Sequence, residues 1–263
     1  MRVSLVIPVH NEAENIAALT QEISRVLCAE HSYEIIFVDD GSQDQTPMIL
    51  SSLQQRFPAV HPVYHLQHYG QSAAMLTGIR HALHPVIVTM DGDGQNDPED
   101  INTLLKLYER SETPTRKVML TGFRRRRCDT RWRKLSSRIA NAVRSRLLGD
   151  GIPDSGCGLK VFSRDLFDSL PTFDHMHRFL PSLVNRVGGK IISVDVNHRP
   201  RRSGRSHYGT LDRLAAGIID LFGVMWLMRR VIVPKTIWVS PDSGRRLEED
   251  GKTRPDWPRV IAN

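Results

Sequence analysis

The sequence of 263 residues contains no long apolar run. A membrane-spanning helix needs about 20 predominantly apolar residues in succession, and the most apolar stretch, residues 214–228, contains Asp220. The N-terminal apolar stretch, residues 3–7, is ended by Pro8 and is too short for the apolar core of a signal peptide. We therefore expect neither a signal peptide nor a transmembrane helix.

Cysteine is also scarce, with Cys28, Cys128 and Cys157 as its three occurrences. Their number is odd and no two of them form a CxxC pair, which argues against a disulfide framework and against a zinc site. Free cysteines are typical of a reducing compartment. The cysteine pattern therefore favours the cytoplasm.

Basic residues outnumber acidic ones, 36 to 29, which gives a net charge of +7 and a pI near 9.6. Ten of the basic residues lie between Arg124 and Arg146, where Asp129 is the sole acid. This charge suits an anionic partner, such as phosphate groups, a nucleic acid or an acidic membrane surface. Aromatic residues are few, and Trp132 alone lies within the basic segment, which argues against nucleic acid.

The first hundred residues alternate short apolar runs with amphipathic stretches. The runs at residues 3–9, 34–38, 63–66 and 86–90 predict buried strands. Helical patterns begin near Asn11, Thr46, Gly70 and Asp97. The alternation predicts an α/β domain with a mainly parallel central sheet flanked by helices.

Polar clusters follow three of the predicted strands, namely His10-Asn11-Glu12, Asp39-Asp40 and Asp91-Gly92-Asp93. Since parallel sheets bind ligands at the carboxyl ends of their strands, we expect the clusters along one edge. Asp91 and Asp93 can hold a hard divalent cation that neutralises a diphosphate. Asp39 and Asp40 can accept from a base or a ribose, or serve only as turn residues.

The second half of the chain has a different pattern. It predicts a strand at residues 118–121, a basic amphipathic helix at 131–148, a strand at 191–196 and an apolar helix at 211–230. Residues 231–263 have the composition of a polar tail. We expect a domain over residues 1–210, a membrane-interface helix over 211–230 and a tail over 231–263.

Three motifs of the first half resemble glycosyltransferase family 2 in order and spacing: VIPVHNE at 6–12, VDDGS at 38–42 and MDGDGQ at 90–95. Later motifs resemble the dolichyl-phosphate mannosyltransferases and other polyprenyl-phosphate sugar transferases; they lie at residues 133–137, 154–160, 177–181 and 201–206. The resemblance covers about residues 2–230. It implies the GT-A fold, a Rossmann-like fold that binds nucleotide sugars.

The same resemblance implies roles for individual residues. The nucleotide pocket would be lined by Pro8, His10, Glu12 and Asp40, with Asp39 nearby. The metal motif, for Mg²⁺ or Mn²⁺, would consist of Asp91, Asp93 and Gln95. The acceptor phosphate would be held by Arg124, Arg133 and Ser137, and a basic loop closing over the donor would contain Arg201 and Ser206. Asp154 could orient Arg124 or Arg133, or could serve only to form a loop.

The sequence departs from the family at two of these motifs. His10 stands where Tyr is usual, and His207, which carries less positive charge at neutral pH, stands where Lys is usual after Ser206. The transmembrane helices that many relatives carry after this point are missing.

We therefore expect inverting transfer of a sugar from a nucleotide-diphosphate sugar, of the GDP-mannose or UDP-glucose type, to a polyprenyl phosphate. The catalytic set would be Asp93, Arg124, Arg133 and Arg201. The enzyme would be peripheral, at the cytoplasmic face of a membrane. Its apolar helix would lie in the interface with a face containing Leu211, Leu214, Ala215, Ile218, Phe222, Met225 and Trp226, widened by Leu221, Val224 and Met228. The alternatives are a family 2 enzyme with a saccharide acceptor and a nucleic-acid-binding protein.

Overall fold

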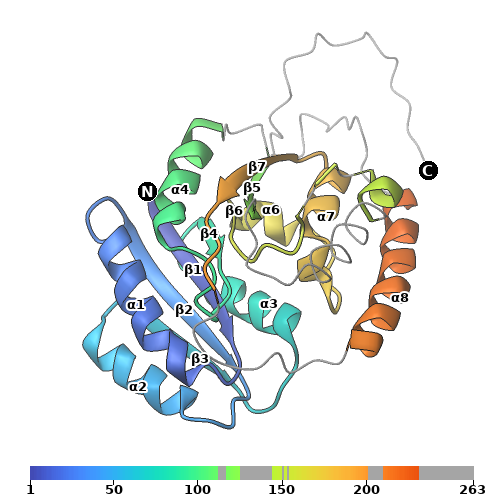
Figure 1. Cartoon of the computed structure of the whole chain (residues 1–263). Helices are drawn as coiled ribbons and strands as arrows, with labels where there is room; N and C mark the ends of the chain where they lie inside the picture. The colour runs from blue at the N-terminus through green and yellow to red at the C-terminus, as the bar shows by residue number, and fades with distance from the viewer. Residues whose placement is uncertain (112–116, 125–143, 150, 153, 201–209, 231–263) are drawn as a thin grey trace, which may run out of the picture. The chain divides into compact units, whose positions relative to one another are not determined.

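A seven-stranded sheet with the order β3-β2-β1-β4-β6-β5-β7 forms the centre of the computed structural model (Figure 1). The model describes residues 1–111, 117–124, 144–149, 151–152, 154–200 and 210–230, the side chains of 210–216 excepted. The strands are β1 (Arg2–Val9), β2 (Ser32–Asp40), β3 (Val60–His65), β4 (Val86–Thr89), β5 (Val118–Arg124), β6 (Lys160–Ser163) and β7 (Lys190–Val196). Only β6 is antiparallel to its neighbours, β4 and β5, so the prediction of a mainly parallel sheet is confirmed.

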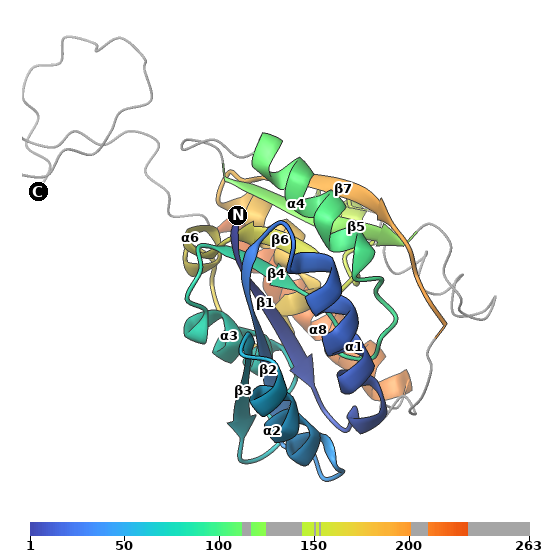
Figure 2. The same cartoon turned by 90° about the vertical axis from the view of Figure 1, so that its left-hand side faces the viewer.

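Helices cover both faces of the sheet, as Figures 1 and 2 show from two sides. One face carries α1 (Ala13–Leu27), α2 (Thr46–Arg56) and α4 (Glu99–Ser111). The other face carries α3 (Gln71–His81), α6 (Arg164–Asp168), the 3-10 turn η1 (Met176–Arg178), α7 (Leu180–Arg186) and α8 (Thr210–Arg229). The sheet is therefore the middle layer of an α/β/α sandwich.

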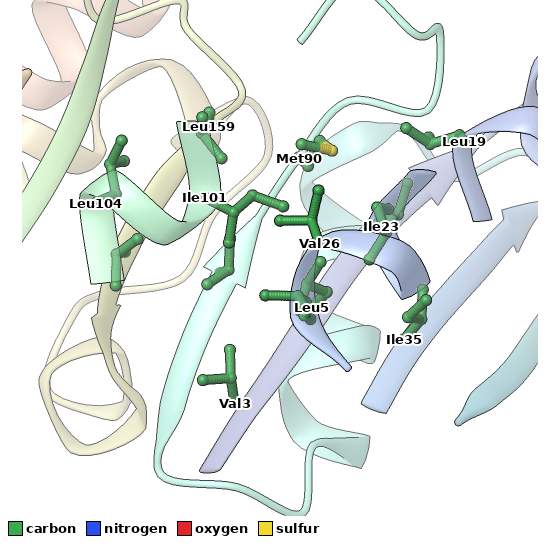
Figure 3. Close-up of a cluster of buried hydrophobic side chains, with 14 of the residues drawn as sticks. Val3, Leu5, Leu19, Ile23, Val26, Ile35, Met90, Ile101, Leu104 and Leu159 are labelled. Carbon is green, nitrogen blue, oxygen red and sulfur yellow. The ribbon is translucent and has the colours of Figure 1, made fainter. Parts of the chain in front are cut away.

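The positions of the core residues follow from the alternation of side chains along the strands and from the helical spacing of apolar residues. In β1, Val3 and Leu5 point to one face and Val6 to the other, and all are fully buried, as expected for a strand covered on both sides. Figure 3 shows Ile23 and Val26 of α1 beside Leu5. Their helical spacing places one apolar stripe of α1 against the sheet, which fixes the helix above the strands whose ends carry the polar clusters.

Several elements differ from the sequence predictions. β2 runs on through Asp39 and Asp40, which pair with Tyr64 and His65 of β3, whereas the prediction ended the strand at Val38. The antiparallel strand β6 and the helices α6 and α7 were not predicted. Of the helix predicted at 131–148, residues 144–148 are helical, and the rest lies outside the described residues.

Helix α8 belongs to the same compact unit as the sheet, Met1–Val231. Its described side chains separate into two sets. Ile218, Ile219, Phe222 and Trp226 are exposed. The side chains that pack against the protein are Leu221, Val224, Met225, Leu227 and Met228. The prediction that Leu221, Val224, Met225 and Met228 belong to the free apolar face is therefore wrong, because these side chains pack against the apolar core on this face of the sheet. Within the described part of the chain, no helix combines the length and the hydropathy needed to cross a membrane.

Candidate functional site

The three polar clusters meet at the carboxyl ends of β1, β2 and β4. The Nδ1 atom of His10 lies 2.8 Å from the backbone oxygen of Asp40, and the backbone N–H of Asn11 donates to Oγ of Ser42 over 2.8 Å. Gly92 lies so close to β1 that an added Cβ would stand 2.5 Å from Cγ1 of Val9. The prediction that the clusters share one edge of the sheet is confirmed.

Asp40 is the last residue of β2, and it is buried, with 3% of its surface exposed. Its Oδ1 accepts from the backbone N–H of Tyr69 at 2.9 Å, and its Oδ2 from that of Gly70 at 2.7 Å. The Nδ1 atoms of His65 and His68 lie 2.7 and 2.8 Å from its carboxylate. Asp40, predicted to line the nucleotide pocket, thus holds the segment after β3 against the ends of β1 and β2.

The other predicted pocket residues stand around Asp40. Pro8 pairs with Val38 within the sheet. Asp39 is buried and accepts from the backbone N–H of Ser42 at 3.1 Å. Glu12 is partly exposed and accepts from Nδ2 of Asn15 at 2.6 Å. Asn11 has a positive φ of 57°, a conformation that asparagine adopts more readily than most residues, and so turns the chain from β1 into α1.

His68, which sequence reasoning did not single out, lies beside His10. Its ring centroid lies 4.4 Å from that of His10, with the ring planes 42° apart. The two imidazoles stand side by side where the resemblance places the nucleotide base. No local signal marks His68, since it reaches His10 only because β2 and β3 are neighbours.

Asp91 and Asp93 follow β4 directly. Oδ1 of Asp91 accepts from Nε2 of Gln71 at 2.9 Å, and Oδ1 of Asp93 accepts from the backbone N–H of Gln95 at 3.1 Å. Burial and the neighbouring charge of Asp93 raise the pKa of Asp91 to about 6. These effects outweigh the charges of Lys160 and Arg124 and the hydrogen bond from Gln71, which lower the pKa of Asp91.

These residues fit a divalent cation that is only partly coordinated by protein. Among the residues described, no cluster of three or more His, Cys, Asp or Glu forms a complete metal cage. Two carboxylates and the Gln95 amide supply oxygen ligands of the kind that Mg²⁺ and Mn²⁺ prefer. Magnesium sites of this type are completed by water and by substrate phosphates. A cation would also favour the ionised form of Asp91, whose pKa is raised.

The motif at residues 154–160, in which the sequence suggested a role for Asp154 alone, ends at the first residue of β6 and reaches Asp91. The backbone of Gly158 lies close to Asp91, so that an added Cβ would stand 2.3 Å from the carboxylate. Oγ1 of Thr89 donates to the Gly158 oxygen at 2.7 Å, and the ammonium of Lys160 donates to the Cys157 oxygen. Lys160 is 4% exposed, and burial lowers the pKa of its ammonium despite the nearby charge of Asp91. The signal in the sequence that could have pointed to Lys160 was the presence of a lysine within the apolar run at 159–162.

Gly158→Ala is expected to weaken metal-dependent nucleotide binding about tenfold or more, because the new methyl group must push Asp91 out of place. Calorimetric titration with a nucleoside diphosphate, with and without Mn²⁺, measures this. Gly223→Ala in α8 is the control, since nothing lies within 4 Å of its added Cβ. Equal affinities in the two variants would contradict the placement of Asp91 as a ligand.

Arg124 ends β5 and forms a bidentate ion pair with Asp154. Its Nε and Nη2 atoms donate to Oδ2 and Oδ1 of Asp154, both at 2.8 Å, and the two side chains are 12% and 5% exposed. Burial lowers the pKa of Arg124, but the pair with Asp154 outweighs this, and Asp91 is close enough to contribute. The structure thus brings Arg124 and Asp154 beside the aspartate motif. Arg133, Ser137, Arg201, Ser206 and His207 lie outside the described residues.

Comparison with known sequences places the family model and similar relatives among the sugar transferases. The model of Glycosyl transferase family 2 matches residues 4–170. A dodecaprenyl-phosphate galacturonate synthase from Rhizobium johnstonii is 36% identical over 234 residues, which cover 87% of this chain and 68% of the relative. An undecaprenyl-phosphate 4-deoxy-4-formamido-L-arabinose transferase from Sodalis glossinidius is 33% identical over 213 residues, which cover 80% and 64%. The chain thus spans about two thirds of the length of these relatives.

Solved structures share the fold. A mannosyl-3-phosphoglycerate synthase from Rubrobacter xylanophilus matches with a TM-score of 0.66 at 19% identity, covering 94% of this chain and 80% of that one. A glucosyl-3-phosphoglycerate synthase from Mycobacterium tuberculosis, in complex with Mn²⁺, UDP-glucose and phosphoglyceric acid, matches with a TM-score of 0.62 at 20% identity, covering 86% and 79%. At these identities the similarity concerns the fold alone.

Proposed function

Because this chain belongs to glycosyl transferase family 2, we propose that it transfers a sugar, with inversion, from a nucleotide-diphosphate sugar to a polyprenyl phosphate. The observation that carries the proposal is the arginine Arg124 held beside the Asp91–Asp93 motif by Asp154. The metal motif suits the diphosphate of the donor. A buried arginine next to it suits a second phosphate, that of the acceptor. Two relatives named for prenyl-phosphate acceptors support this choice.

The donor would bind along the edge formed by β1, β2 and β4. The base would lie near His10 and His68, with Asp39 and Glu12 as acceptors for base or ribose groups. Its diphosphate would lie against Asp91, Asp93 and Gln95, and a bound Mg²⁺ or Mn²⁺ would neutralise the leaving nucleoside diphosphate. The mycobacterial enzyme that shares this fold was solved with Mn²⁺ and UDP-glucose, which supports a divalent cation and a nucleotide sugar as ligands to test.

The acceptor needs little activation. A phosphate monoester has a second pKa near 6, so it is already a nucleophilic anion at neutral pH. The work of the protein is to hold that phosphate in line with the anomeric carbon, and such positioning can supply a large share of the rate. We assign the holding to Arg124, together with Arg133 and Ser137, while Asp154 fixes the plane of the Arg124 guanidinium.

The donor sugar is proposed only by class. GDP-mannose and UDP-glucose are the first donors to test. The names of the relatives add a galacturonate and a 4-deoxy-4-formamido-L-arabinose donor.

Radiolabelled transfer from each donor to undecaprenyl phosphate in detergent, with and without Mn²⁺, tests the proposal. We expect label in the lipid phase with one donor, and its loss on chelation with EDTA. A phosphate-bearing soluble acceptor, 3-phosphoglycerate, and a neutral saccharide serve as alternative acceptors. Transfer to either of them, and none to the lipid, would reject the polyprenyl acceptor while leaving a family 2 glycosyltransferase.

We further propose that the enzyme is peripheral and approaches the cytoplasmic face of a membrane through α8. The exposed stripe of α8 consists of Ile218, Ile219, Phe222 and Trp226, and Phe222 and Trp226 are 65% and 62% exposed. Arg229 ends the helix and Arg230 follows it, and cations at this position suit anionic headgroups. Asp220 faces inward instead, with Oδ2 placed 2.9 Å from Nδ1 of His175, which anchors the helix.

The variant Phe222→Ser/Trp226→Ser is expected to lose flotation with anionic liposomes at low salt, whereas wild type floats. Each large apolar side chain removed from the interface costs about 1.5–3 kcal/mol of binding. The control is Leu66→Ser, since Leu66 is 99% exposed but lies after β3. If wild type stays at the bottom, or if the double variant unfolds, α8 is a core or oligomer element instead.

A further inference from the structure

The metal motif continues into residues 95–100, which run between α1 and the end of β7. We propose that Arg199 is a positioning residue that holds this segment, and with it Gln95 and Asp93, in the geometry needed for metal-dependent nucleotide binding. The proposal rests on the proposed function, since it takes Asp91, Asp93 and Gln95 as the metal motif.

The first support is the backbone. Asn96 forms an isolated antiparallel bridge with His198, and the backbone N–H of Arg199 donates to the Gln95 oxygen at 2.9 Å. One step earlier, the backbone N–H of Asn197 donates to Oδ2 of Asp100 at 2.7 Å. Residues 197–199, which follow β7, therefore lie against residues 95–100.

The second support is the guanidinium of Arg199, which bridges two carboxylates from different elements. Nη1 donates to Glu22 of α1, and Nη2 donates to Oδ1 of Asp97 at 2.7 Å. Burial lowers the pKa of Arg199, but the bonds to Glu22 and the charge of Asp97 outweigh it and raise the pKa. The side chain thus stays cationic and links three parts of the chain: α1, residues 95–100 and the residues that follow β7.

The consequence for the metal follows from the short distance along the chain. Gly94 has a φ of +71°, and the next residue, Gln95, donates its N–H to Asp93. A shift of Gln95 therefore moves the hydrogen-bonding partner of Asp93. Binding sites tolerate displacements of only about 0.5 Å, and residues that orient metal ligands are worth about 10–100-fold in metal affinity.

A second ion pair nearby provides a matched control. Arg25 of α1 pairs with Glu99 of α4 at 2.7 Å, and these side chains are 70% and 58% exposed. The Arg199 side chain is 29% exposed and Asp97 is 16% exposed. Both pairs brace α1 against the start of α4, but only Arg199 also contacts Gln95. A purely structural role would make the two pairs alike.

The test compares Arg199→Ala, Arg199→Lys and Arg25→Ala in the full chain. Affinity for UDP and for GDP is measured by calorimetry with and without MnCl₂, alongside the melting temperature. For Arg199→Ala we expect an affinity about tenfold weaker with Mn²⁺ and unchanged without it. Arg199→Lys, which can keep one of the two ion pairs, should lose less, and Arg25→Ala should match wild type.

The outcomes separate the proposals. If Arg199→Ala changes only the melting temperature, or weakens binding equally with and without Mn²⁺, Arg199 is a structural brace and the inference is overturned. If wild type shows Mn²⁺-dependent nucleotide binding but no transfer to polyprenyl phosphate, the acceptor assignment fails and the inference on Arg199 stands. If wild type shows no Mn²⁺-dependent binding at all, the metal motif and the inference fail together.

Discussion

Asp93→Asn is expected to lower turnover about 10³-fold, a loss of about 4 kcal/mol of transition-state stabilisation. Asparagine keeps the size of the side chain and the oxygen that accepts from Gln95, but removes the charge that would hold the cation. Since a bound cation would neutralise the leaving diphosphate, the loss should appear mainly in the Mn²⁺-dependent part of donor binding and in the rate of transfer. Titration calorimetry and steady-state kinetics measure the two effects.

The fold should survive this change. Asp93 is partly exposed, and surface substitutions of this kind usually alter stability by about 0.5 kcal/mol or less. The matched control is Asp168→Asn, which removes a carboxylate that is 61% exposed and 3.9 Å from Arg164 in α6. Unchanged nucleotide affinity and unchanged Mn²⁺ dependence in Asp93→Asn would show that the motif does not hold the metal.

The sequence was most informative where one local rule decides position. Strands buried on both faces read as apolar runs, and β1, β2 and β4 appear where these runs predicted them. Because the carboxyl ends of parallel strands meet, the order of the residues along the chain was enough to place His10, Asp40 and Asp91 at one edge. The predictions of a family 2 glycosyltransferase and of its α/β fold are confirmed.

Contacts set by the order of strands could not be predicted in this way. Gly158 meets Asp91 because β6 is inserted antiparallel between β4 and β5, and no periodicity within residues 154–163 encodes that choice. His65 and His68 reach Asp40 because β3 lies beside β2. The roles of these residues depend on neighbours that are distant in sequence, and local patterns carry no information about them.

Helix α8 shows a different limit. Its apolar residues occur nearly all round the helix, so spacing alone could not decide which side meets the protein. Val224 and Met225 were assigned to the free side but pack against the core, while Ile219, which was left out, is 71% exposed. Which face of α8 is covered is decided by its packing on a core formed by residues distant in sequence.

The second large effect concerns Arg124 and Asp154, taken as a double-mutant cycle with Arg124→Met and Asp154→Leu. Each single change removes one member of this buried ion pair, which is expected to cost about 3–5 kcal/mol of unfolding free energy. The double variant replaces both charges by apolar groups and should lose much less than the sum of the two. Urea denaturation of the four proteins measures this coupling.

Activity should not recover with stability. If Arg124 holds the acceptor phosphate, the double variant should be folded and should bind nucleotide in the presence of Mn²⁺, yet transfer to polyprenyl phosphate should stay at least about 10²-fold below wild type. Lys106→Met, which removes an exposed pair with Glu30, should change stability by about 1 kcal/mol or less and leave transfer unchanged. A double variant with wild-type transfer would make the pair purely structural. Single variants as stable as wild type would instead show that the buried pair does not stabilise the fold.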